Sequence, residues 1–203
     1  MTAMRRDAIE NRQRLVDAAD EVFARNGLDA PVDSIALAAG VGIGTLYRHF
    51  STKEALIEHL VADLYERTLV AGRRALLKED GTGLEEFLRH AIGSQQRSGG
   101  CLSRLWEVPR PESFLVEFDA LIEELLAQAK AKGTIREECS ATDVSLALWA
   151  ARGVLEVSGD LSNAWERLLE IILAGLRPGA APLDQPALTP GERAAIFRSR
   201  APA

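Results

Sequence analysis

Apolar residues recur at intervals of three and four along the first 176 positions, which is the period of an amphipathic helix. No segment shows the sustained alternation, rich in β-branched residues, that is typical of strands. The sequence therefore predicts an all-α fold. The expected helices span residues 7–26, 33–39, 43–50, 52–77, 82–97, 111–133, 141–158 and 162–176.

Signals at the helix ends support these boundaries. A Ser or Thr followed three residues later by an acidic residue is typical of a capping box, which satisfies two otherwise unpaired amide groups. The pairs are Ser51 with Glu54, Thr82 with Glu85, and Ser140 with Asp143. Gly27 follows the first helix, where glycine readily adopts the left-handed conformation that ends a helix.

The helices at 141–158 and 162–176 are apolar on nearly all sides. Such helices must be covered on several sides, and one protomer supplies too few neighbours for both. We therefore expect these helices from two copies of the chain to form a four-helix interface in a homodimer. Its expected contact residues are Leu148, Leu155, Trp165, Leu168, Leu169 and Ile172.

Composition divides the chain into a first domain at residues 1–54, a second at 55–176 and a tail at 177–203. The net charge of −6 on its own argues against a nucleic-acid partner. The excess acid lies in the second zone, with 13 Lys and Arg against 20 Asp and Glu, whereas the first zone has seven against eight. Five of the eight prolines lie in the last zone among Ala and Gly, so we expect a mobile tail with a weak helical pattern at 192–200.

Further features exclude several classes of protein. Cys101 and Cys139 are too few for a disulfide framework, and no apolar run approaches the roughly 20 residues needed to cross a bilayer. Without a recognisable signal peptide, the expected compartment is the cytoplasm. The three histidines are far apart and no nucleophile motif is present, so no metal, cofactor or enzymatic activity is expected.

The most informative segment is residues 32–50, VDSIALAAGVGIGTLYRHF, in which two short helices turn at Gly40. The residues expected to close a small core with the first helix are Ile35, Ala36, Ala39, Leu46 and Phe50. The outer face of the second short helix carries Thr45, Arg48 and His49, with Tyr47 at its flank and Lys53 just beyond. These residue types at helical spacing read base edges and phosphates when a helix lies in the major groove.

The string GVGIGTLYRHFSTKEAL, between an amphipathic helix and a long one, resembles the DNA-binding domain of the TetR family of bacterial transcriptional regulators over about residues 10–60. The resemblance implies a homodimer, a ligand pocket in the C-terminal part, and release of DNA when a small molecule binds. It also implies base or phosphate contacts at Ile43, Gly44, Thr45, Tyr47, His49 and Lys53, to which the groove-facing pattern adds Arg48.

Two positions depart from the family pattern. Val32 stands where the family usually has a Thr that caps the second helix, so Asp33 or Ser34 is expected to serve there, and Ser34 is also a candidate DNA contact. Gly42 replaces the usual Ser before the third helix, which costs little because Gly also caps tolerably.

Other residues leave alternatives open. Arg5, Arg6 and Arg12 flank the first helix and either reach a minor groove or phosphates, or serve only solubility. Cys101 is either a redox sensor or, as is more usual for a single thiol, a small buried hydrophobe.

A ligand sensor needs a cavity, which we expect between Phe87 and Phe118, where two helix breaks interrupt the packing. The expected lining residues are Phe87, His90, Trp106, Phe114, Phe118, Trp149 and Arg152. Aromatic residues at helical spacing are more often simply core. Arg152 either pairs with Glu156, the simpler expectation, or meets an anionic ligand or the partner subunit.

The sequence thus predicts a homodimeric repressor that binds a palindromic operator in double-stranded DNA and is released by a small-molecule effector, with no membrane partner. The alternative is a ligand-independent, DNA-bound scaffold whose C-terminal helices recruit another protein. A sizeable, partly polar cavity favours the repressor, whereas a solid core with an exposed apolar patch outside the dimer contact favours the scaffold.

Overall fold

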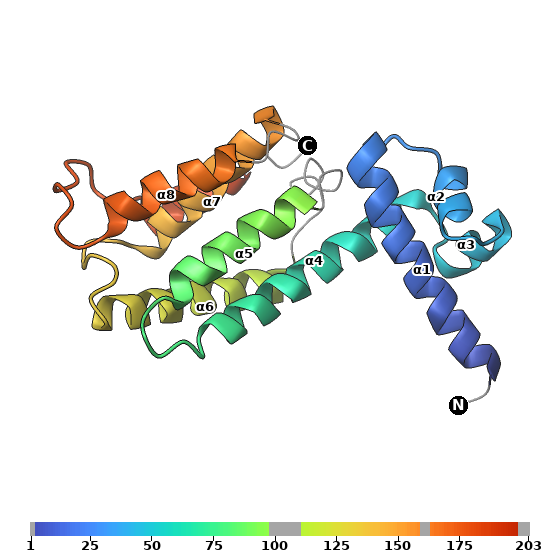
Figure 1. Cartoon of the computed structure of the whole chain (residues 1–203), viewed down its shortest axis with the longest axis horizontal. Helices are drawn as coiled ribbons and strands as arrows, with labels where there is room; N and C mark the ends of the chain where they lie inside the picture. Colours follow the sequence, from blue (N-terminus) through green and yellow to red (C-terminus); the bar gives the residue numbers. More distant parts are fainter. Residues whose placement is uncertain (1–2, 98–110, 159–162, 199–203) are drawn as a thin grey trace. The chain divides into compact units, whose positions relative to one another are not determined.

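The computed structural model describes residues 3–97, 111–158 and 163–198 (Figure 1). These residues form nine helices and contain no strand, which confirms the predicted all-α fold. The helices are α1 Ala3–Asn26, α2 Val32–Ala38, α3 Ile43–His49, α4 Lys53–Ala75, α5 Gly83–Arg97, α6 Glu112–Ala131, α7 Ala141–Ser158, α8 Ala164–Leu176 and α9 Pro190–Arg198. In this described part of the chain, no helix has the length and apolar character that crossing a membrane requires.

The chain divides into two compact units, and the division falls inside α4, after Tyr65. The first unit contains the described residues up to Tyr65, and the second contains residues 66–96 and the described residues from 111 onward. This division lies later than the boundary predicted at residue 54. The reason is that the first turns of α4 bury Leu56 and Leu60 in the core of the first unit.

The first unit has a small apolar core shared by α1, α2, α3 and the start of α4. All the core residues predicted from α2 and α3 are buried: Ile35, Ala36, Ala39, Leu46 and Phe50. From α1 they meet Leu15, Val16, Ala19 and Phe23. Burying a side chain such as Leu46 or Phe23 stabilises a fold by about 1.5–3 kcal/mol, so this face of α3 is firmly held.

Turns and caps agree with the sequence patterns at most positions. Gly27 and Gly40 have positive φ angles of 74° and 66°, as their predicted turns require. At the start of α4, however, the side-chain cap is Thr52 and not Ser51. The Thr52 hydroxyl accepts a hydrogen bond from the amide of Ala55 at 3.1 Å.

The other two predicted capping boxes have different outcomes. At α7 the box is confirmed, because the amide of Ser140 donates to Asp143 Oδ2 at 2.8 Å and the amide of Asp143 donates to Ser140 Oγ at 3.3 Å. At α5 the predicted pairing is wrong, because the amide and hydroxyl of Thr82 both donate to Asp80, at 3.0 and 2.6 Å, and not to Glu85.

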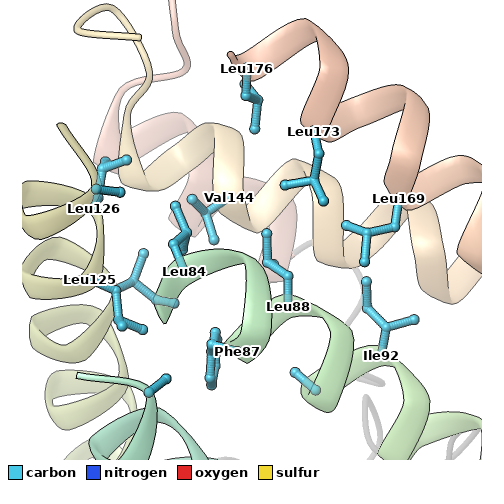
Figure 2. Close-up of a cluster of buried hydrophobic side chains, with 14 of the residues drawn as sticks. Leu84, Phe87, Leu88, Ile92, Leu125, Leu126, Val144, Leu169, Leu173 and Leu176 are labelled. Carbon is cyan, nitrogen blue, oxygen red and sulfur yellow. The ribbon is translucent and has the colours of Figure 1, made fainter. Parts of the chain in front are cut away.

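The second unit has a larger core in which α5 faces α6, α7 and α8 (Figure 2). The buried side chains of α5 include Leu84, Phe87, Leu88 and Ile92. Opposite them lie Leu125 and Leu126 of α6, Val144 of α7, and Leu169, Leu173 and Leu176 of α8. The last two long helices therefore turn large parts of their apolar surface toward their own protomer.

A close contact joins α4 to α6 within the second unit. A methyl group placed on Gly72 would overlap the side chain of Leu121, so only glycine allows this approach. One residue further along, Arg73 forms an ion pair with Glu117 of α6. A displacement of α6 toward α4 at this level therefore presses on the backbone of α4 at Gly72.

The chain beyond Leu176 differs from the expected unpacked tail. The buried Arg136 donates to the carbonyls of Gly175 at 3.2 Å and Ala181 at 2.8 Å. The Thr142 hydroxyl donates to the carbonyl of Leu188 at 2.7 Å. The composition of the tail predicted that it forms no packed core, and none of its described side chains is buried. Composition did not reveal that polar groups of the second unit bind the tail's backbone.

The tail then continues into α9, close to the weak helical pattern predicted at 192–200. Thr189 and Glu192 form a capping box, with the Thr189 amide donating to Glu192 at 2.8 Å. This bond and the Thr189 hydroxyl lower the pKa of the Glu192 carboxyl. The guanidinium of Arg193 donates hydrogen bonds to both carboxylate oxygens of Asp119 on α6, and this pairing raises the pKa of the guanidinium. The tail thus fastens to α6 by a charge-assisted pair.

Candidate nucleic-acid interface and regulatory unit

The helices α2 and α3 are joined by a tight turn at Gly40. The amide of Val41 donates to the carbonyl of Ala36 at 3.0 Å, which closes the end of α2. Gly42 then caps α3 from its extended conformation, as predicted, and its carbonyl accepts a hydrogen bond from the amide of Thr45 at 2.8 Å. The two helices pack on α1 through Ile35 and Leu46, so the opposite side of α3 faces solvent.

The solvent side of α3 carries the residues expected to touch DNA. Tyr47 is 50% exposed, Ile43 is 38% exposed, and Arg48 is also exposed. Thr45 and His49 are half-buried, while nothing lies near the position that a side chain on Gly44 would occupy. Ile43, Gly44, Tyr47 and Arg48 therefore lie on the accessible side of α3, and Thr45 and His49 lie at the edges of that side.

Arg48 is held on this face by its own helix. Its Nε donates to the carbonyl of Gly44 at 3.1 Å, and its Nη2 donates to Thr45 Oγ1 at 3.2 Å. These bonds reduce the number of orientations of a long side chain and thereby lower the entropic cost of binding. A guanidinium fixed in this way is suited to a two-pronged contact with guanine or phosphate.

The two remaining candidates flank α3. Lys53, at the start of α4, is half-buried with its Nζ 5.9 Å from the centre of the Phe23 ring. Ser34 donates its hydroxyl to the carbonyl of Pro31 at 2.6 Å. Pro31 is the N-cap of α2 and makes no side-chain cap, which corrects the expectation that Asp33 or Ser34 takes that role.

Arg12 occupies a different place from the one considered for it in the sequence. Its guanidinium lies 4.8 Å from the centre of the Phe50 ring, and its Nη1 lies 2.8 Å from Nε2 of His59 on α4. Arg12 therefore lies inside the first unit's packing. The side chains of Arg5 and Arg6 lie outside the described part of the structure.

Three of the expected pocket residues meet in the second unit. The rings of Phe87 and Phe118 lie 6.1 Å apart, and those of Phe114 and Phe118 lie 5.5 Å apart. Phe87 is fully buried, whereas Phe114 and Phe118 are half-buried at the edge of the core. The aromatic cluster of Phe87, Phe114 and Phe118 is thus partly core and partly accessible.

The other expected pocket residues are placed differently. His90 is exposed on α5 and Trp149 is half-buried on α7. Arg152 is buried and its Nε donates to Glu156 at 2.7 Å, which confirms the simpler expectation of a pair one turn apart. Trp106 lies outside the described residues, as does Cys101. Cys139, by contrast, is buried, and burial raises the pKa of its thiol to about 11.

The residues predicted at the dimer contact are turned mainly toward their own protomer. Leu155, Trp165 and Leu169 are buried in the core of the second unit, with exposed fractions of 7%, 7% and 0%. Leu148, Leu168 and Ile172 are half-buried against the same core. Sequence periodicity could not predict this burial. Because α7 and α8 are apolar on nearly all sides, their periodicity does not indicate which side of each helix faces inward.

Other apolar residues of α7 and α8 do reach solvent. Val157 is 90% exposed, Ile171 is 56% exposed and Leu146 is 40% exposed. On α7 the exposed positions Leu146, Ala150, Gly153 and Val157 follow one another at intervals of three and four and so form a stripe. The spacing of this stripe is visible in the sequence. It was not singled out because two of its four residues are small and the rest of α7 carries larger apolar residues.

A groove of about 480 Å³ lies at one end of the second unit, away from the expected cavity. Its lining residues are Gly81, Thr82, Leu84, Glu85, Gly133, Thr134, Ile135, Leu173, Arg177 and Pro178. None of the predicted pocket residues is among them. Its charged groups Glu85 and Arg177 approach each other at 3.8 Å.

A helix-turn-helix with polar and basic side chains on the free face of its second helix, joined by a long helix to an α-helical second unit, defines a class of DNA-binding proteins. Two sequence models of protein families match the chain. "Bacterial regulatory proteins, tetR family" matches residues 15–60, and "Transcriptional regulator SbtR-like, C-terminal domain" matches residues 79–178.

Individual relatives agree. A TetR transcription regulatory protein from Mycobacterium vanbaalenii is 32% identical, with a TM-score of 0.65 over 86% of this chain and 99% of that one. A TetR transcriptional regulator from Streptomyces coelicolor is also 32% identical, with a TM-score of 0.63 over 83% and 99%. The HTH-type transcriptional regulator UidR of Escherichia coli K12 is 36% identical over 95 residues, which are 46% of this chain and 47% of UidR. The chain thus spans about half the length of this curated relative.

The chain belongs to the TetR family of transcriptional regulators. It is a DNA-binding regulator, and its family is not enzymatic.

Proposed function

We propose that this protein is a homodimeric repressor that binds a palindromic operator through α3 and leaves it when a small molecule binds the second unit. The observation that carries the proposal is the division of α3 into two faces. Leu46 and the neighbouring Phe50 lock one face into the core, while Thr45, Tyr47 and Arg48 share the accessible side. A helix fixed in this way enters a major groove without first rearranging.

The roles of the α3 residues follow from their chemistry. Arg48, oriented by Thr45, is the candidate for a guanine or phosphate contact, while Thr45 and Ile43 present methyl groups suited to thymine. Tyr47 and His49 hold the phosphate backbone with Lys53 and Ser34, and Gly44 allows that backbone to approach α3 closely. Because these cations are few, the affinity for DNA should fall only modestly as salt rises.

A dimer is supported by the exposed apolar surface of α7 and α8. Leu146, Val157 and Ile171 are exposed in the protomer, and Ala150 and Gly153 between them allow close packing of helices. Pairing this surface with its copy about a two-fold axis gives the four-helix arrangement in which Leu146, Val157 and Ile171 replace the buried residues first expected there.

Response to an effector is supported by the aromatic cluster and its route to α4. A small apolar or aromatic molecule inserted beside Phe114 and Phe118 displaces α6. Leu121 of α6 packs against the backbone of α4 at Gly72, so a displacement of α6 is transmitted to α4. The effector changes DNA binding only to the extent that it prefers one of the two arrangements of α4.

One observation favours the alternative, a DNA-bound scaffold. Leu115 and Val116 are exposed on α6, outside the α7 and α8 surface. In this alternative, a partner protein binds over Leu115 and Val116 while α3 stays on DNA, and no effector is involved.

The decisive experiment is selection of genomic DNA fragments by the purified full-length protein, followed by footprinting. The proposal expects two protected half-sites related by a dyad and one helical turn apart. Effector candidates suggested by the neighbouring genes are then added, and at least one should release the fragment. Protection of an asymmetric single half-site would contradict the dimeric arrangement, and retention under all such compounds would favour the scaffold.

A further inference from the structure

The contact between Arg12 and His59 ties three elements of the first unit together. We propose that His59 is a positioning residue for DNA recognition: its neutral ring accepts a hydrogen bond from Arg12 and so holds the guanidinium over Phe50, at the end of α3. The inference rests on the proposed role of α3 in reading the operator, and it adds a proton-sensitive control of that role.

The geometry joins residues that are far apart in the sequence. Arg12 Nη1 lies 2.8 Å from His59 Nε2, and Nη2 lies 3.4 Å from Nδ1 of the same ring. The guanidinium carbon lies 4.8 Å from the centre of the Phe50 ring, and the rings of Phe50 and His59 lie 5.6 Å apart. Each of the three side chains therefore touches both others.

The chemistry of Arg12 fixes the protonation state of His59. A guanidinium only donates hydrogen bonds, so the imidazole nitrogen that faces it must supply a lone pair. We assign Nε2, which makes the shorter of the two contacts, as this acceptor, and place the proton of the neutral ring on Nδ1. A doubly protonated ring offers no lone pair and carries a positive charge toward Arg12, so this arrangement forms only with a neutral His59.

The surroundings of His59 favour the neutral form. Burial lowers the pKa of its imidazole below the ordinary value of 6.5, and the charge of Arg12 on α1 lowers it further. Asp63, one turn along α4, acts in the opposite direction and is the weaker influence. Phe50, from the end of α3, adds no charge. Because folding disfavours protonation, the contribution of this contact is complete above pH 6.5 and is lost as the pH falls toward the lowered native value.

Phe50 connects this contact to DNA recognition. It is the C-cap residue of α3, its ring is buried, and its amide donates to the carbonyl of Leu46 at 2.8 Å. Arg12 covers this ring from α1, while the ring of His59 lies beside it from α4, tilted by 37°. When the ring of His59 is protonated, Arg12 is repelled from the Phe50 ring, and the last turn of α3, which carries Arg48 and His49, loses its support.

The test measures DNA affinity as a function of pH. If His59 had only a structural role, replacing it would change the stability of the protein but not the pH dependence of its DNA affinity. The probe is a labelled duplex carrying the motif that the full-length wild-type protein enriches from a random-sequence library. Dissociation constants are measured from pH 7.5 to 5.5 for wild type and His59→Gln. The amide oxygen of Gln accepts a hydrogen bond and does not titrate in this range.

The wild type should lose about fivefold more affinity than His59→Gln between the two pH values, as expected for losing one hydrogen bond of ordinary strength. Any other pH dependence of DNA binding is common to both proteins and cancels in the comparison. His59→Leu, which cannot accept a hydrogen bond, should bind weakly at both pH values. Equal pH profiles for wild type and His59→Gln would overturn the proposal.

Arg12→Ala and Arg14→Ala form a matched pair of substitutions on α1. Both remove one positive charge, but Arg14 is exposed and bonded to Asn11 instead of His59. In a protein that carries Arg12→Ala, adding His59→Gln should no longer change the pH profile of DNA binding. In a protein that carries Arg14→Ala, adding His59→Gln should change the profile as it does in the wild type. Should His59→Gln still change the profile in the Arg12→Ala protein, Arg12 would not be the partner and the inference would fail.

A third control separates this inference from the proposed function. Replacing Tyr47 or Arg48 by Ala tests whether α3 reads the duplex at all. Unchanged affinity in both variants would refute the role of α3, whereas reduced affinity combined with equal pH profiles would refute only the role of His59.

Discussion

The two units of the chain use apolar residues in opposite ways. In the first unit, α3 divides cleanly, with Leu46 buried and its neighbour Tyr47 half exposed. In the second, α8 is apolar on both sides, so that Leu169 is fully buried while Ile171 is 56% exposed. Polarity along a helix therefore identifies a functional face where the partner is a polyanion, but does not identify one where the proposed partner is a second apolar helix.

The largest expected effect tests the inward side of α8. Leu169→Ala should lower the free energy of unfolding by about 3 kcal/mol, because it opens a cavity between α5 and α8. Ile171→Ala removes as large an apolar side chain two residues away and should cost far less in a protomer held dilute. Chemical denaturation measures both. Similar losses at the two positions would remove the distinction between an inward and an outward face.

The next effect tests the outward side. Val157→Asp places a charge in the proposed dimer surface and should raise the dimer dissociation constant by about thirtyfold or more, with normal helix content. The matched control is Val116→Asp on α6, where the residue is also exposed, at 66%, but lies outside that surface. Sedimentation equilibrium measures the change. A dimer insensitive to Val157→Asp would place the interface elsewhere.

A smaller effect tests the polar face of the first unit. Arg48→Ala should weaken operator binding by about tenfold, as expected for losing one base or phosphate contact, and leave the unfolding free energy nearly unchanged. Arg25→Ala, on α1, removes an exposed arginine paired with Glu21 and serves as the control. Fluorescence anisotropy at fixed salt compares the two variants. If both variants weaken binding equally, then net charge and not the position of Arg48 is what matters.

The smallest effect concerns the tail. Asp119→Asn breaks the charge pair with Arg193 and should cost about 1 kcal/mol or less, since the carboxylate is partly exposed and screened by water. Arg167→Ala breaks an exposed pair with Glu170 on α8 and should change nothing measurable. Thermal unfolding at low and high salt compares them, and a loss in Asp119→Asn that persists in high salt would point to packing instead of charge.

The sequence was sufficient for the first unit because its signals are local. Gly40, Leu46 and Phe50 lie within one short motif, and their spacing determines which side of α3 is free. What the sequence did not reveal there is the contact of Arg12 with His59, which are 47 positions apart. No helical period relates residues at that separation, and an arginine side chain is usually exposed to solvent.

In the second unit the helices were predictable but their facing sides were not. Val144, Leu148 and Leu155 look alike in sequence, and the placement of the surrounding helices α5, α6 and α8 decides how deeply each is buried. The binding of the tail's backbone could not be predicted for a related reason. Composition reports whether a segment contributes side chains to a core, and it does not report whether another part of the chain binds its carbonyl groups, as Arg136 and Thr142 do.

The way in which the tail is held has an evolutionary consequence. Arg136 and Thr142 bind the carbonyls of Ala181 and Leu188, and every amino acid carries the same carbonyl group. Apart from Gly179, whose φ of 84° favours glycine, residues 178–188 are therefore free to change in identity without losing their path along the second unit. Selection should act instead on the two anchoring residues, so related chains should retain an arginine and a hydroxyl at these positions while their tails diverge.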